Sequence, residues 1–362
     1  MKKLKVRYLV TKQEDNIKII SNTTIELEKI LINKDIEKYI DKVTTDLVAL
    51  PLFINGHIHI LDKWLDKFFH TMYIDDVVGA PFGIKYFYLN IAAESTLLES
   101  IEYALTTAAN NGTGKVLTVV ELGLRNYKLV NKISEKIKIP QVEQYLEPSV
   151  FHVTQNEETS EKIISEIENI AKLGMNIELI SPLNYTREEL EFTKEIKRRY
   201  NLKVMTHVSE TYDTHEEGDL EQAIELLDAD ILVHCTFISE SEVEYLIGRD
   251  VVINPKSNLK LVGKLPPIEH FVKNDINVFI GTDNVGLNDP NIWDELKVLY
   301  EHVNPEIVRR VFSNNLLENL QRIQVVSVKN IESLDSSNLT SFIKNLCKNV
   351  VNVIGVVEIS DF

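Results

Sequence analysis

The chain has little cysteine, no long apolar run and too few basic residues to balance its acidic ones. Cys235 and Cys347 are its two cysteines, so no disulfide framework is expected, which favours a reducing compartment. No run approaches the roughly 18 apolar residues of a membrane span, so no membrane partner is expected. The formal net charge of −16 disfavours a nucleic-acid partner, because binding phosphates needs a basic face.

The length and the apolar content set the size of the fold. With 362 residues, 44% of them hydrophobic, the chain can form one large α/β domain and a small accessory one. Residues Leu4–Val10 follow two lysines in the manner of a signal peptide, but Lys5 and Arg7 interrupt the apolar run. We therefore expect a soluble protein of the cytoplasm.

From residue 51 onward, short apolar runs alternate with segments of helical period, which is typical of βα units around a parallel sheet. Eight strands with helices between them favour a closed (β/α)8 barrel over an open sheet. We assign residues 51–320 to this barrel. The eight candidate strands are Leu52–His57, Lys115–Leu122, Gln141–Glu147, Asn176–Ile180, Lys203–Val208, Ile231–Cys235, Val251–Asn254 and Asn277–Thr282.

Both ends of the chain have a different pattern, with short strands and polar turns. We expect residues 1–50 and 321–362 to join in one small accessory β-domain. Its candidate strands are Leu4–Val10, Ile17–Ser21, Thr24–Leu27, Val325–Val328 and Val350–Ile359.

Two histidines end the first barrel strand, in the stretch Pro51–His59. Residues i and i+2 of an extended chain lie on the same face, so the imidazoles of His57 and His59 point the same way. Two neutral imidazoles at the mouth of a buried strand are a good start for a first-row metal site. The alternative is that they are ordinary polar residues at a strand end.

Further polar residues stand at the ends of later strands. His207 ends the fifth strand with Glu210 just beyond it, His234 ends the sixth and Asp283 follows the eighth. A single histidine at a strand end is more often structural. Catalytic residues of such barrels lie at the C-terminal ends of the strands, so together these side chains predict one site at one rim.

Residues 60–96 form an unusually long connection after the first strand, and long connections in compact domains are usually functional. The segment is rich in aromatic residues, which either line a substrate site or form a satellite hydrophobic cluster or a subunit contact. These aromatic residues are Trp64, Phe68, Phe69, Tyr73, Phe82, Tyr86, Phe87 and Tyr88.

The strand-end motifs together resemble those of the amidohydrolase superfamily. They are His57-Ile58-His59, His207-Val208-Ser209-Glu210, Val233-His234-Cys235 and Gly281-Thr282-Asp283. Asn254–Leu261 resembles the strand-seven segment of its mononuclear aminohydrolase branch, which includes cytosine, guanine and S-adenosylhomocysteine deaminases and chlorotriazine hydrolases. The resemblance covers about residues 51–320. It implies a distorted (β/α)8 barrel with a small β-domain made from both termini.

The resemblance also implies roles for residues of this chain. His57, His59, His207 and Asp283 would hold one divalent metal ion, and Asp283 would also act as the base for the attacking water. Glu210 would carry a proton to the leaving group, and His234 would orient the water and the developing oxyanion. The fourth candidate strand, Asn176–Ile180, has no lysine that could be carbamylated to bridge two metals, which favours a single ion. Imidazole and carboxylate ligands favour Zn²⁺, with Fe²⁺ as the alternative.

We therefore expect a metal-dependent hydrolase that acts on a C–N bond and deaminates a small cyclic amidine or nitrogen heterocycle. Trp64, Asn184, Ser257 and Asn258 are the candidate substrate contacts. Leu183 stands where the deaminases often have a histidine, which argues against adenosine-type substrates. The alternatives are hydrolysis of a cyclic amide or of another leaving group, and an idle barrel serving as a binding or assembly subunit. The oligomeric state stays open, with a homo-oligomer among the options.

Overall fold

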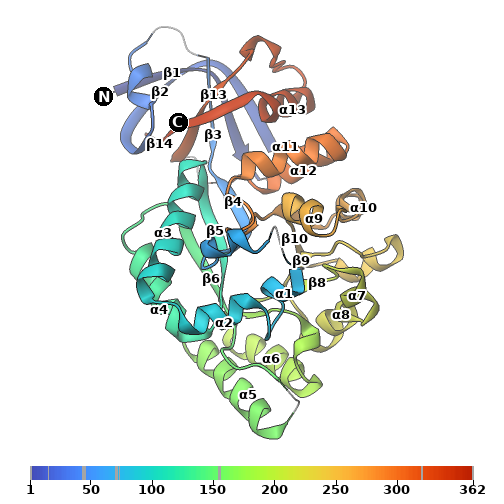
Figure 1. Cartoon of the computed structure of the whole chain (residues 1–362). Helices are drawn as coiled ribbons and strands as arrows, with labels where there is room; N and C mark the ends of the chain where they lie inside the picture. Colours follow the sequence, from blue (N-terminus) through green and yellow to red (C-terminus); the bar gives the residue numbers. More distant parts are fainter. Residues whose placement is uncertain are drawn as a thin grey trace.

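The structure is a computed structural model that describes residues 2–14, 16–42, 46–69, 72, 74–153, 156–318 and 321–360. These residues form a large curled sheet surrounded by helices and a smaller closed sheet at one end of the molecule (Figure 1). No helix within the described ranges is long and apolar enough to cross a membrane.

Parallel strands make up the large sheet, in the order β11-β10-β9-β8-β7-β6-β5-β4-β12. The strands are β4 (Phe53–His59), β5 (Thr113–Val120), β6 (Gln141–Leu146), β7 (Asn176–Leu179), β8 (Val204–Val208), β9 (Ile231–His234), β10 (Asp250–Ile253), β11 (Asn277–Ile280) and β12 (Asp283–Asn284). Strands β4 to β11 match the eight predicted strands to within two residues at either end. The predicted α/β barrel architecture is confirmed.

The two edges of this sheet meet through a short stretch of chain. Strands β11 and β12 lie at opposite ends of the strand order, yet only Gly281 and Thr282 separate them in the sequence. The Gly281 N–H donates to Ile253 O (2.8 Å) on one side, and the Thr282 N–H donates to His57 O (3.0 Å) on the other. A Cβ at position 281 would lie 2.8 Å from His57 O, so glycine permits this close approach. The crossing places Asp283 beside the two histidines of β4.

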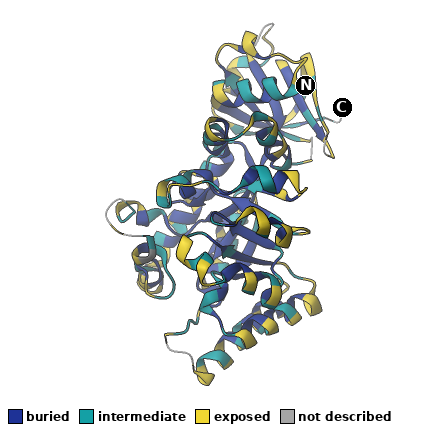
Figure 2. Cartoon of the chain, turned by 90° about the vertical axis from the view of Figure 1, so that its right-hand side faces the viewer, coloured by how far each residue is buried: buried dark blue, intermediate teal, exposed yellow. Residues whose placement is uncertain are grey.

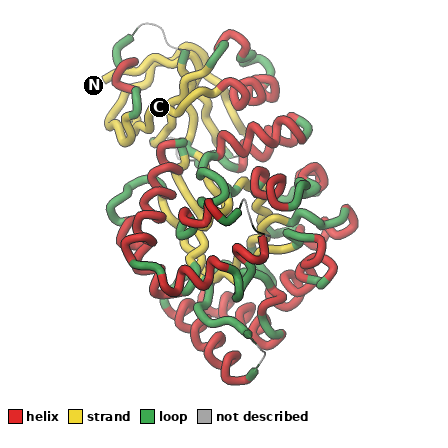
Figure 3. The backbone as a smooth tube through the Cα atoms, in the orientation of Figure 1, coloured by secondary structure: helices red, strands yellow, loops and turns green. Residues whose placement is uncertain are grey.

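Apolar side chains fill the interior of the curled sheet. Val119, Tyr145, Met205, Val233 and Val252 pack together although their strands are not all neighbours, which places the cluster inside the ring. Strands occupy the centre and helices the outside (Figure 3), and the strands are the more deeply buried elements (Figure 2). The site described below rests on this packed interior, which is a core and not a pore.

Helices connect the successive strands and cover the outer face of the sheet. They are α3 (Glu94–Asn110), α4 (Gly123–Ser134), α5 (Glu157–Lys172), α6 (Arg187–Tyr200), α7 (Tyr212–Glu216), α8 (Asp219–Glu221), α9 (Pro255–Leu261), α10 (Ile268–Lys273), α11 (Ile292–His302) and α12 (Pro305–Asn314), with short helical turns η3 (Pro182–Asn184), η4 (Gln222–Leu227) and η5 (Glu240–Leu246).

The smaller sheet is closed and uses both ends of the chain, in the order β1-β2-β14-β13-β3. It comprises β1 (Lys2–Gln13), β2 (Asn16–Asn33), β3 (Leu47–Pro51), β13 (Arg322–Val328) and β14 (Val350–Ile359), with η1 (Ile36–Tyr39), η6 (Ile331–Ser333) and α13 (Leu339–Asn349) beside it. The division of the chain at residues 50 and 320 remains a prediction.

One prediction for the smaller sheet was wrong. Ile17–Ser21 and Thr24–Leu27 were expected to be separate strands, but both belong to the single strand β2. Pairing with β1 continues on both sides of Asn22, whose φ of 53° accommodates an irregular position without ending the strand.

The long segment after β4 folds back into the barrel rim. It contains η2 (Lys63–Lys67), α1 (Ile74–Val78) and α2 (Ile84–Ile91). Its aromatic residues divide into two groups: Tyr86 is buried, whereas Phe82 and Phe87 are 76% and 68% exposed. Tyr73 lies outside the described residues.

Trp64 is held within this segment. Its ring stacks on Tyr88 at a centroid distance of 3.6 Å, and its Nε1–H donates to Leu61 O (3.1 Å). Both contacts favour the alternative reading of Trp64 as part of the internal packing of the segment, and its contact with substrate stays a prediction.

Substitution of Trp64 tests the packing role. Trp64→Ala should lower the free energy of unfolding by about 2–4 kcal/mol, because it removes the stacked partner of Tyr88 from a partly buried site. Phe87→Ala is the matched control, since this ring is largely exposed, and should change stability by less than about 0.5 kcal/mol. Urea denaturation measures both. An unchanged stability with a raised KM would instead assign Trp64 to the substrate site.

Candidate active site

A cavity of about 530 Å³ opens at the C-terminal ends of the barrel strands. Side chains from four strand ends reach it, which is where barrels of this kind carry their chemistry. They are His59, His207, His234 and Asp283. Segments beyond the strand ends complete the wall, among them Phe69, Lys85, Leu183, Asn184 and Glu210.

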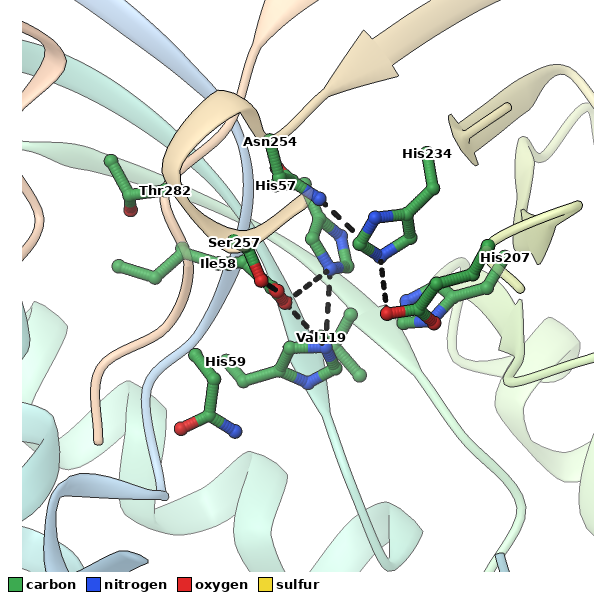
Figure 4. A network of polar contacts seen from close by, with 12 residues as sticks. His57, Ile58, His59, Val119, His207, His234, Asn254, Ser257 and Thr282 are labelled. Atoms are coloured by element: carbon green, nitrogen blue, oxygen red, sulfur yellow. Dashed lines mark hydrogen bonds and ion pairs between the residues drawn. The ribbon is translucent and has the colours of Figure 1, made fainter. Parts of the chain in front are cut away.

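Three histidines converge at the base of this cavity. One ring nitrogen of each of His57, His59 and His207 lies within 4.8 Å of the others, and His57 Nε2 is 3.1 Å from His59 Nε2 (Figure 4). Burial lowers the pKa of His57 to about 3, and burial together with His57 lowers the pKa of His207 well below its usual value. The rings of His57 and His207 are therefore neutral at pH 7 and have lone pairs available for a metal ion.

Asp283 adds a carboxylate to the three imidazoles. Its Oδ1 lies 3.7 Å from His57 Nε2 and 3.6 Å from His59 Nε2. Although burial alone would raise the pKa of Asp283, its position beside His57 and the other histidines holds the pKa well below its usual value. The four residues predicted as metal ligands thus come together, as donors of the kind that zinc binds in proteins.

Local backbone geometry aims these side chains at the cavity. His234 and Asp283 have φ angles of 72° and 60°, in the left-handed region that is uncommon for residues other than glycine. Ser209, between His207 and Glu210, has a φ of 49°. Backbone conformations of this kind cost about 1–3 kcal/mol each and are often found at functional sites, with which their occurrence at this rim agrees.

His234 and Glu210 form a second group of polar side chains around His207. His234 Nε2 lies 3.5 Å from Glu210 Oε1, and His207 Nδ1 lies 3.9 Å from Glu210 Oε2. The Asn258 Nδ2 amide is 3.1 Å from His234 Nδ1. With the Asn258 amide donating to Nδ1, the ring proton is assigned to Nε2, which lies 3.5 Å from both Glu210 Oε1 and the side-chain nitrogen of Asn254.

Ser257 and Asn258 occupy a different place from the one expected of substrate contacts. Both are buried, because the side chains of α9 pack beneath the rim. The Ser257 hydroxyl donates to Asp283 Oδ2, and Asn258 also donates to Thr236 Oγ1 (2.7 Å). Their polar groups are thus engaged with Asp283 and His234. Asn184 does line the cavity, so its role toward substrate stays a prediction.

Three charged residues next to His59 were not predicted from the sequence as part of the site. The His59 Nδ1–H donates to Glu121 Oε1 (2.6 Å), and Lys85 Nζ forms ion pairs with Glu121 Oε1 (2.6 Å) and Asp62 Oδ2 (3.0 Å). Burial alone would raise the pKa of Glu121, but Lys85 and His59 hold it at about 2. A glutamate directly after Val119 and Val120 was a usable signal for Glu121, whereas nothing in the sequence pointed to Lys85.

Two further carboxyl groups are buried in the barrel. Burial, reinforced by the negative charge of Glu121, raises the pKa of Glu147 to about 8, and the Tyr86 hydroxyl donates to Glu147 Oε1 (3.1 Å). Glu178 Oε1 lies 3.5 Å from His207 Nε2, and neither Glu178 oxygen has a hydrogen-bond partner among the described residues. Burial, with Glu147 nearby, raises the pKa of Glu178 well above its usual value.

The raised pKa of Glu147 predicts a pH-dependent cost of folding. Glu147 is protonated in both states below pH 4, but only the unfolded state ionises as the pH rises toward 8, so its contribution to stability falls across this range. Glu147→Gln should therefore become more stable relative to the wild type between pH 5.5 and 7.5, by at most about 1.4 kcal/mol per pH unit. Urea denaturation of both proteins at the two pH values measures this difference. Parallel pH profiles would contradict it.

Comparison with known proteins places this site in a family. A sequence model of the amidohydrolase family matches residues 48–336. A 5'-deoxyadenosine deaminase of Methanosphaera stadtmanae is 26% identical over 313 residues, which are 78% of this chain and 69% of that protein. An uncharacterised protein of Methanocaldococcus jannaschii is 24% identical over 337 residues, 87% of this chain and 86% of that protein.

Solved structures with the same fold include two enzymes of known activity. A mutant atrazine chlorohydrolase of Arthrobacter aurescens, complexed with zinc and atraton, superposes with a TM-score of 0.73 at 12% identity, covering 98% of this chain and 95% of that one. The guanine deaminase of C. acetobutylicum, with bound guanine, gives a TM-score of 0.67 at 14% identity and covers 99% of this chain and 100% of that one. Since the family match spans most of the chain and the fold agrees, the protein belongs to the amidohydrolase family and is a metal-dependent hydrolase.

Proposed function

We propose that this protein hydrolyses a C–N bond by deaminating a nitrogen heterocycle or a small cyclic amidine. The observation that carries the proposal is the convergence of His57, His59 and His207 with Asp283 at one end of the cavity. Relatives named as deaminases support the reaction, and the apolar side chains of Phe69 and Leu183 in the cavity wall suit a flat ring.

In this proposal His57, His59, His207 and Asp283 hold one divalent ion. Zinc is favoured by the imidazole-rich ligand set, and ferrous iron is the alternative. When bound, the ion supplies a Lewis acid that lowers the pKa of an attacking water toward 7. The fit is supported by the buried His207 Nε2, which lacks a hydrogen-bond partner among the described residues.

The remaining groups move protons around the reacting carbon. Asp283 accepts a proton from the attacking water at its Oδ1, while Ser257 holds the other oxygen. Protonated Glu210 delivers its proton to the leaving nitrogen, so the C–N bond breaks and ammonia departs, and the proton taken up by Asp283 then replaces the one that Glu210 has lost. The Nε2–H of His234 donates to the oxygen on which negative charge develops, and Asn258 keeps that proton on Nε2.

The substrate is proposed only at the level of its class. Asn184 lines the cavity, where its amide could form hydrogen bonds with the polar edge of a substrate ring. Leu183 places an apolar group where related deaminases often have a histidine. We would therefore test the protein for ammonia release from four kinds of compound separately: adenosine-type nucleosides, guanine, cytosine and chlorotriazines. Release of another leaving group without ammonia would favour the cyclic amide or chlorohydrolase reading, and no turnover by the zinc-bound protein in any arm would favour an idle barrel.

Replacing the proposed proton carrier separates chemistry from metal binding. Glu210→Gln should lower kcat by about 10²–10⁴, because the neutral amide cannot deliver a proton to the leaving nitrogen. Zinc content, measured by atomic absorption, and melting temperature should stay at their wild-type values. Glu216→Gln, an exposed position on α7, is the control and should leave kcat unchanged. Wild-type turnover by Glu210→Gln would assign the proton transfer to another residue.

A further inference from the structure

Lys85 is a lysine that the proposed reaction does not use, yet it is almost fully enclosed. Its side chain is 1% exposed and comes from α2, in the long segment that follows β4. The ammonium group lies at the cavity wall between two carboxylates, Asp62 Oδ2 at 3.0 Å and Glu121 Oε1 at 2.6 Å.

These two carboxylates need a cation. Asp62 and Glu121 are both fully buried and lie just beyond β4 and β5, where each charge would otherwise be separated from water. A buried charge without a partner is strongly unfavourable, and removing one member of a buried pair leaves the other uncompensated. Lys85 therefore permits the carboxylates to remain ionised inside the protein.

The ionised Glu121 in turn fixes a candidate metal ligand. Its Oε1 accepts the Nδ1–H of His59 at 2.6 Å, and Lys85, whose ammonium also lies 3.1 Å from that nitrogen, acts on His59 through its ion pair with this carboxylate. With the proton held on Nδ1, the lone pair of His59 lies on Nε2, which faces His57 Nε2 and Asp283 Oδ1. Outer groups of this kind typically change metal affinity by about 10–100-fold when they are mutated.

We propose that Lys85 is a positioning residue that couples the docking of α2 to metal binding at His59. Lys85 can pair with Glu121 and Asp62 only when α2 lies against the barrel rim. The segment that lines the cavity therefore also sets the orientation of His59, a candidate metal ligand. By linkage, a bound ion must stabilise the docked segment by the same factor by which docking strengthens ion binding. The inference rests on the proposed metal site but requires no particular substrate.

A purely structural ion pair is the competing explanation, and the chain contains a matched control for it. Lys197 on α6 is also largely buried and also pairs with two carboxylates, Asp230 Oδ2 at 3.1 Å and Asp228 Oδ2 at 3.7 Å. Of its two partners, Asp228 also pairs with Arg198 and Arg249, and Asp230 accepts the Val204 N–H, and none of these residues lines the cavity. Loss of Lys197 should thus disturb folding without disturbing the histidines.

The test is zinc affinity, measured by competition with a chromophoric chelator in the absence of substrate. Lys85→Met should weaken zinc binding by about 10–100-fold, whereas Lys197→Met should change it by less than about twofold even though it lowers the melting temperature. The proposal is overturned if Lys85→Met binds zinc as the wild type does, if Lys197→Met weakens binding equally, or if the wild type binds no zinc. Tight zinc binding without ammonia release would contradict only the proposed function.

Hydrogen exchange of the wild-type protein provides a second test, which does not require Lys85→Met to fold. Added zinc should slow amide exchange in Ile84–Ile91 by about tenfold or more, while α5 (Glu157–Lys172), remote from His59, should exchange at the same rate with and without zinc. Equal exchange of the α2 amides in both conditions would overturn the coupling.

Discussion

Burial of several imidazoles and carboxylates at one rim of the barrel is the constraint on which the rest of this structure depends. His57, His59 and Asp283 lie where water is scarce, and polar groups placed there cost free energy unless they find partners. Neighbouring side chains provide hydrogen-bond partners: Glu121 accepts from His59, and Ser257 donates to Asp283. The ring nitrogens and carboxylate oxygen that these hydrogen bonds do not use have lone pairs directed at one point. A divalent cation is the ligand that suits such a set of donors.

Much of this arrangement could be predicted from the sequence because strand ends carry a strong local signal. An apolar run that stops at a histidine or aspartate fixes both the strand and the rim at which its last side chain lies. That reasoning found His57, His59, His207, His234 and Asp283, and the structure brings all five to one cavity rim or to the ring cluster beneath it. Resemblance to the amidohydrolase superfamily added the expected roles, and the family match supports the chemistry.

What the sequence could not supply was the direction of side chains outside the strands. Ser257 and Asn258 follow strand β10 closely, but only the turn of α9 decides that they face Asp283 and His234 and not the cavity. Lys85 lies 26 residues after His59 in a segment without a clear period, so its contact depends on how α2 packs back on the rim. The continuity of β2 through Asn22 likewise follows from pairing with β1, which local pattern does not reveal.

The central claim is that one divalent ion is held by His57, His59, His207 and Asp283. A crystal structure of the protein with zinc, with the ion located by anomalous scattering at the zinc edge, tests it most directly. The account predicts one strong peak with His nitrogens at about 2.0–2.1 Å and the Asp283 carboxylate at about 2.0–2.2 Å. A peak held by other residues, or these four side chains remaining apart without zinc between them, would contradict it.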